Sequence, residues 1–65
     1  MDFSKEDLLE AKRQIDSTLH KLEETIRTLE GKEHPQRYKS QITLARRRVR
    51  AFTIAKALIE RELGR

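Results

Sequence analysis

The feature that most constrains this 65-residue chain is a pair of apolar heptad patterns separated by a short break. Apolar side chains that recur in steps of three and four residues fall on one face of an α-helix. The first pattern comprises Leu8, Ile15, Leu19, Leu22, Ile26 and Leu29, and the second comprises Tyr38, Ile42, Ala45, Val49, Phe52 and Ile59. The chain is therefore predicted to form two amphipathic helices.

The two patterns also fit each other when one is read in reverse. Facing residues of an antiparallel helix pair have position numbers with a nearly constant sum, and Leu8 with Ile59 gives 67. Lys12 and Lys56 interrupt the two patterns in the same layer, since their numbers give 68. We expect these lysines to lay their carbon stems over the core and to extend their ammonium groups to water.

The start of the first helix carries several agreeing signals. Ser4 is the expected N-cap, because its hydroxyl can accept a hydrogen bond from the backbone N–H of Asp7 while the Asp7 carboxylate reaches back. Phe3 and Leu8 flank this capping box at the positions of a hydrophobic staple. The helix is therefore predicted to begin at residue 5.

The break between the patterns has the residues of a helix end followed by a helix start. Gly31 suits a left-handed C-terminal cap, and Pro35 suits the first turn of the next helix. A connection this short forces neighbouring helices to lie antiparallel. We therefore predict an all-α antiparallel hairpin with helices at about 5–30 and 35–63, forming a single domain over 1–65.

Composition argues against several functional classes. The chain has no cysteine, and its two histidines, His20 and His34, lie far apart and have no nucleophile nearby, so we expect no metal, no cofactor, no small-molecule substrate and no enzyme activity. No apolar run approaches the ~20 residues that span a bilayer. We therefore expect no membrane association and a cytoplasmic location.

The two flanks beside the apolar faces differ in character. On one flank Glu30 falls opposite Lys39 and Glu23 falls opposite Arg46, so we expect ion pairs there. The other flank is predicted to carry a second packing seam, whose residues are Ala11, Thr18, Thr25, Leu44, Ala51, Ala55 and Leu58. Since so short a chain has few other sources of stability, we expect this seam to bind a second copy, giving a four-helix bundle, or another helical protein.

The second predicted helix is strongly basic. Residues 35–63 carry eight positive and two negative side chains, a net charge of +6, whereas residues 5–30 carry five positive and seven negative ones, a net charge of −2. Candidate contacts with nucleic acid, which we call the basic strip, are Lys39, Arg46, Arg47 and Arg50. The competing interpretation is solvated charge with intramolecular pairing, because consecutive arginines wrap around a helix.

Two hypotheses therefore remain for the function. The first is a non-catalytic helical interaction module that self-associates. The alternative is a small nucleic-acid-binding accessory protein that uses the basic second helix.

Overall fold

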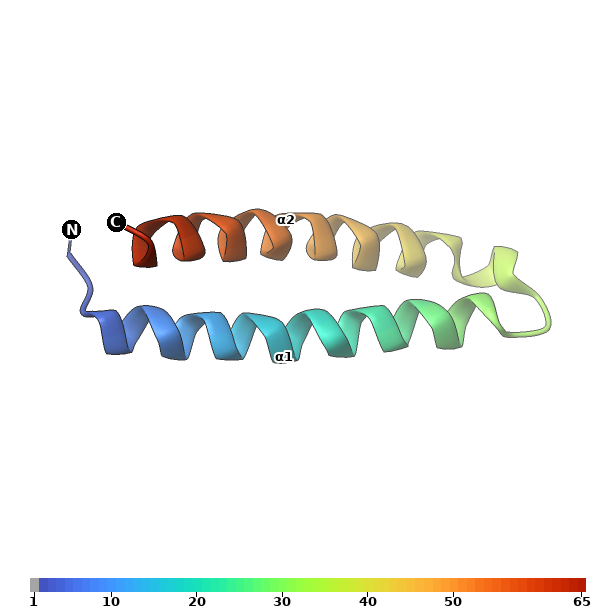
Figure 1. Ribbon diagram of the computed structural model, residues 1–65. Helices are drawn as coiled ribbons and strands as arrows, with labels where there is room; N and C mark the ends of the chain where they lie inside the picture. The colour runs from blue at the N-terminus through green and yellow to red at the C-terminus, as the bar shows by residue number, and fades with distance from the viewer. Residues whose placement is uncertain (1) are drawn as a thin grey trace.

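The computed structural model describes residues 2–65 and shows two long antiparallel helices joined by a short connection (Figure 1). Helix α1 spans Lys5–Glu30, the 3-10 helix η1 spans Pro35–Tyr38, and helix α2 spans Lys39–Leu63. The predicted all-α hairpin is confirmed. Met1, which the predicted domain of 1–65 includes, lies outside the described residues.

Helix α1 begins where its capping residues predict. The Ser4 hydroxyl accepts a hydrogen bond from the Asp7 backbone N–H at 3.0 Å, and the Asp7 carboxylate accepts one from the Ser4 N–H at 3.4 Å. Glu6 and Asp7 place negative charge in the first turn, where the helix dipole favours it. The predicted capping box and helix start are both confirmed.

The end of α1 differs from the prediction at Gly31. Its φ is −82° and its ψ is −5°, so the predicted left-handed cap is wrong. The chain leaves the helix by a right-handed turn instead, in which the Gly31 N–H donates to the Arg27 carbonyl and the Lys32 N–H donates to the Leu29 carbonyl. These bonds satisfy the terminal carbonyls without a residue of positive φ.

The second helical segment also begins differently from the prediction. Residues Pro35–Tyr38 form a 3-10 turn, and the α-helix starts only at Lys39. His34 makes no side-chain hydrogen bond to the free N–H groups, whereas its carbonyl accepts a 3-10 bond from the Arg37 N–H at 3.1 Å. A start without a capping side chain is thus tightened into a 3-10 turn.

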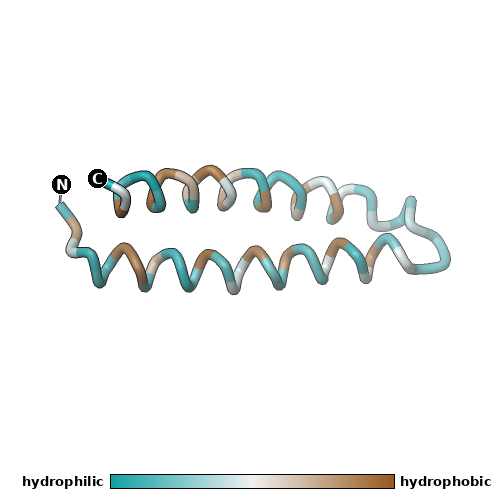
Figure 2. Tube along the Cα trace, in the orientation of Figure 1, coloured by the Kyte–Doolittle hydropathy of each residue, from teal (hydrophilic) through white to brown (hydrophobic). Residues whose placement is uncertain are grey.

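The core between α1 and α2 is thin. Its buried side chains are Leu19 and Leu29 from α1 and Ile42 and Ala45 from α2, and no described side chain is completely buried. Hydrophobic stretches recur along the side of α1 that faces α2 (Figure 2). Within residues 2–65, neither helix has a stretch apolar and long enough to cross a bilayer. Two helices alone therefore leave much of this apolar surface partly exposed.

Candidate interaction surfaces

Three ion pairs join α1 to α2. Lys12 Nζ lies 3.3 Å from Glu60 Oε2, and Lys56 Nζ lies 2.7 Å from Asp16 Oδ1. The third pair joins Arg46 to Glu30. We call these six residues the charged flank, because their heptad positions place all of them along the same side of the hairpin. The predicted charged side of the helix pair is therefore present.

The partners on this flank differ in detail from the predicted ones. Arg46 pairs with Glu30, rather than with Glu23, and Lys39 makes no ion pair with any described residue. The physical reason is the tilt of helical side chains toward the N-terminus of their own helix. Because α2 runs antiparallel to α1, Arg46 leans toward the turn and so reaches the acidic residue nearest to it.

The same tilt explains the two lysines at core positions. Lys12 pairs with Glu60, which lies four residues after Lys56, and Lys56 pairs with Asp16, which lies four residues after Lys12. The two pairs are therefore arranged symmetrically. The side chains of Lys12 and Lys56 are 34% and 32% exposed. Their stems thus cover the core as predicted, but the ammonium groups bind carboxylates of the facing helix.

The environment of Lys56 favours its charged form. The hydrogen bond to Asp16 raises the pKa of Lys56 above its usual 10.5, and the Coulomb attraction of the same carboxylate adds to this. Partial desolvation opposes the rise, and the charge of Glu60 supports it. Lys56 therefore stays protonated and paired at neutral pH.

The predicted seam is exposed along the opposite flank. Its two leucines, Leu44 and Leu58, are 46% and 57% exposed. Ala51 and Thr25 are also exposed, whereas the other three seam residues are half-buried. Among residues 2–65, no ion pair joins the two helices on this side. One flank of the hairpin is therefore closed by charge and the other is open and apolar.

The structure adds Ile54 to this apolar surface. Ile54 is 47% exposed and lies next to the seam, because it follows Ala51 by three residues and precedes Leu58 by four. The heptad pattern missed it because it lies one step further from the core than the seam does. The signal that could have found it is this spacing to two seam residues.

A hollow of about 510 Å³ lies at the open end of the hairpin, beside the seam. Its lining is mostly apolar and includes Ala11, a seam residue, together with Phe3, Leu8 and Ile59. Phe3 is 58% exposed, although it was predicted to form a staple with Leu8. The two helices do not fill this end by themselves.

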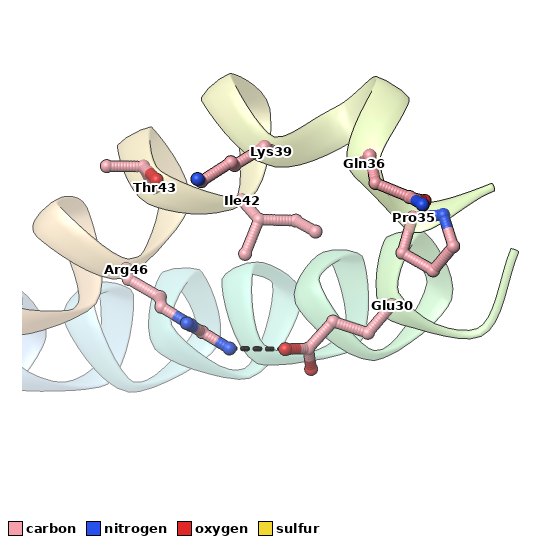
Figure 3. Close-up of a pocket in the computed structure, with 7 residues that line it drawn as sticks. All are labelled: Glu30, Pro35, Gln36, Lys39, Ile42, Thr43 and Arg46. Atoms are coloured by element: carbon pink, nitrogen blue, oxygen red, sulfur yellow. Dashed lines mark hydrogen bonds and ion pairs between the residues drawn. The ribbon is translucent and has the colours of Figure 1, made fainter.

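The basic strip lies on the first half of α2. Lys39 and Arg46 line a hollow of about 300 Å³ near the turn, where the Arg46 guanidinium points to Glu30 (Figure 3). Arg47 and Arg50 are exposed, and in the part of the chain that the structure describes neither forms an ion pair. Three of the four strip residues therefore carry charge without an acidic partner.

The two histidines are separate from these surfaces. His20 is exposed on α1, and His34 is exposed in the connection. Within residues 2–65 no three His, Cys, Asp or Glu side chains are grouped closely enough to hold a metal ion. Comparisons of this chain with protein-family models, with curated proteins and with solved structures find no match.

Proposed function

We propose that this chain is a non-catalytic helical interaction module that self-associates through the seam into a four-helix bundle. The observation that carries the proposal is the difference between the two flanks. Three ion pairs close one side of the hairpin, whereas Leu44 and Leu58 stand about half exposed on the other, with Ile54 beside them on the outer face of α2. Exposed apolar side chains that recur along one side of a small protein support an interaction site there.

Burial of the seam would add stability that the hairpin lacks. Among residues 2–65 only four apolar residues are buried, and a chain without cysteine has no disulfide to supplement them. Fully burying a leucine stabilises a protein by about 1.5–3 kcal/mol relative to leaving it exposed, so each half-exposed leucine has about half of that still to gain. The small residues Ala11, Thr18 and Thr25 allow another helix to approach closely.

The dimensions of the hairpin suit a second copy of the chain. The hairpin measures 46 × 16 × 15 Å, so a second copy laid along one long side could follow the seam over its whole length. The two helices also differ in the sign of their charge, with +6 over residues 35–63 and −2 over residues 5–30. A second copy thus offers a helix of complementary charge and equal length.

The direct test is sedimentation equilibrium of the purified chain at micromolar concentration. We expect twice the chain mass of 7.7 kDa, with only a weak dependence on salt, because burial of the apolar seam is the main contribution and the attraction between the oppositely charged helices is a minor one. A well-folded monomer under these conditions would contradict self-association. Binding to a different helical protein would then remain, with the same seam as its site.

A pair of matched variants locates the interface. Ala51→Glu with Leu58→Glu places two negative charges in the seam, and we expect monomers or unfolded chains because an unpaired charge is costly to bury. The control is Thr43→Glu with Ala57→Glu, which adds the same charge to exposed positions of α2 away from the seam. Equal effects of the two variants on the mass would remove the seam from the interface.

We also propose a location for the chain in the cell. We place the module in the cytoplasm, where a chain without disulfides needs no oxidising environment. Fractionation of cells that express a tagged chain tests this location.

A further inference from the structure

The basic side chains of α2 follow one row along the helix. Lys39, Thr43, Arg46 and Arg50 recur in steps of four, three and four residues, which keeps them on one face, and Arg47 borders this row. At a rise of about 1.5 Å per residue, the row from the first to the last of them extends about 16 Å. The basic strip is therefore an elongated cationic surface on a straight helix.

The charges of the strip are available to an external anion. No acidic residue occurs between positions 34 and 60, and Arg46 alone of the strip has an acidic partner among the described residues. The Arg46 and Glu30 side chains are 62% and 44% exposed. Exposed pairs of this kind contribute only about 0–1 kcal/mol, so Arg46 can exchange the carboxylate for a phosphate at little cost.

Most of the basic strip points away from the seam, whereas Arg47 borders it, because Arg47 follows Leu44 by three residues and precedes Ala51 by four. Residues two apart on a helix point about 200° apart, so Arg46 faces nearly opposite to Leu44. Ala51 lies about 140° from Arg46 by the same geometry. A second copy bound at the seam thus leaves the other three strip residues in solvent, so these cations can bind an anion while the seam is covered.

We propose that the basic strip binds the phosphate backbone of double-stranded nucleic acid without sequence preference. This goes beyond the proposed self-association. Three of its four cations are arginines, whose planar guanidinium groups match phosphate oxygens in pairs. Backbone contacts of this kind give affinity by counterion release and carry no sequence information.

The aromatic residues favour a duplex over a single strand. Single strands bind to exposed aromatic rings on which successive bases stack. The aromatic residue nearest to the strip is Tyr38, which is half-buried and has the Lys32 ammonium 5.6 Å from its ring centroid. Phe52 is half-buried on the core side of α2. The strip therefore has cations for a backbone but no platform for bases.

The position of the apolar residues favours nucleic acid over a membrane surface. A helix that lies in a bilayer interface inserts large apolar side chains beside its cations. The row that contains Lys39, Arg46 and Arg50 is interrupted only by the small polar Thr43. The exposed leucines of α2 belong to the seam, and Ile54, four residues after Arg50, is a single apolar side chain at the end of the row.

Fluorescence anisotropy with a labelled, mixed-sequence DNA duplex over a series of salt concentrations tests the proposal. Four neutralised phosphates predict a slope of about −3.6 for log K against log salt, and so a loss of about a hundredfold in affinity between roughly 50 and 200 mM salt. Arg47→Glu with Arg50→Glu should weaken binding more than tenfold at the lower salt and reduce the slope by about two.

The matched control reverses two cations on α1 near the open end of the hairpin, away from the strip. Lys5→Glu with Arg13→Glu changes the net charge by the same amount, and both residues are exposed. Because charges further away than about 10 Å are largely screened at moderate salt, we expect this control to keep most of the affinity. Circular dichroism must show equal helix content for both variants. If the strip variant Arg47→Glu with Arg50→Glu unfolds, Arg47→Gln with Arg50→Gln takes its place.

Four results would overturn the proposal. The first is no duplex binding at the lower salt, and the second is an equal loss of affinity in the two charge-reversal variants. The third is tighter binding of a single strand than of the duplex. The fourth is tighter binding to vesicles of phosphatidylcholine with one third phosphatidylserine than to the duplex. A wild type that binds the duplex with the expected slope, and loses it only in the strip variant, supports the assignment.

Discussion

Lys56 of α2 places its ammonium nitrogen 2.7 Å from a carboxylate oxygen of Asp16 on α1, although its own position belongs to the apolar face. The facing pair of Lys12 with Glu60 repeats the arrangement in the opposite direction. Together they tie the two helices at one layer of the core. This layer therefore fixes the register through charge where the other layers fix it through apolar contacts.

The Lys56 pair predicts how stability depends on pH. The pKa of Lys56 is raised above 10.5 in the folded chain, so the protonated form contributes stability that is fully present below pH 10.5 and is lost as the pH rises through the folded pKa. The unfolding free energy of wild type minus that of Lys56→Gln should be constant from neutral pH to about 10.5 and shrink above it. Urea titrations at several pH values measure this difference.

A control separates this pair from the general effect of losing positive charge. Lys39→Gln removes an exposed ammonium group that has no acidic partner among the described residues. Its difference from wild type should show no comparable step. A difference for Lys56→Gln that stays unchanged well above pH 10.5 would refute a stabilising pair.

The register predicts that Ile15 faces Phe52 across the core. Phe52 is half-buried, so we expect Phe52→Ala to lower the unfolding free energy by about 2 kcal/mol, less than the 3–5 kcal/mol typical of a fully buried phenylalanine. The control is Phe3→Ala, because Phe3 is 58% exposed and should contribute less than Phe52. Chemical denaturation at one fixed chain concentration compares the two. Equal losses would place Phe52 outside the core.

The capping box predicts a larger effect at Ser4 than at other serines. Ser4→Ala removes the acceptor for the Asp7 N–H and should cost about 1 kcal/mol, which lowers the melting temperature by roughly 4–8 °C in a domain of this size. Ser17→Ala changes an exposed serine inside α1 and should be neutral or slightly stabilising, because alanine is the better helix former. Thermal melts followed by circular dichroism measure both.

Double-mutant cycles can distinguish the observed pair of Arg46 with Glu30 from the predicted pair of Arg46 with Glu23. Both side chains of the observed pair are exposed, so its coupling energy should be below about 1 kcal/mol but measurable. Arg46→Glu should be rescued by Glu30→Arg and not by Glu23→Arg. Rescue at position 23 instead would restore the pairing predicted from sequence.

The sequence predicts the hairpin well because its signals are local or periodic. A capping box involves only four consecutive residues, and the heptad steps show which face of each helix is apolar. Both features can therefore be recognised from the sequence alone. The two ends of the connection were harder to predict. The conformation of Gly31, and the choice between an α-helix and a 3-10 turn at Pro35, depend on which hydrogen bonds the terminal backbone groups make, and several arrangements can satisfy those groups.

The candidate surfaces were predicted in outline and missed in detail. The seam residues were identified from their flank, and the structure leaves that flank open. The partner of Arg46 was wrong because numbering alone ignores the direction in which helical side chains lean. Ile54 was missed because its position belongs to the outward rows of the heptad, and only its neighbours make it part of a larger apolar surface.

The beginning of α1 and the end of α2 lie at the same end of the hairpin (Figure 1), where Lys5 and Leu63 line one hollow. A domain whose two ends lie close together can be inserted into a surface loop of an unrelated protein without separating the ends of that loop. The hairpin would then stand out from its host as a rigid rod up to 46 Å long, displaying both flanks along its length. The architecture is therefore suited to use as a spacer inserted into another protein.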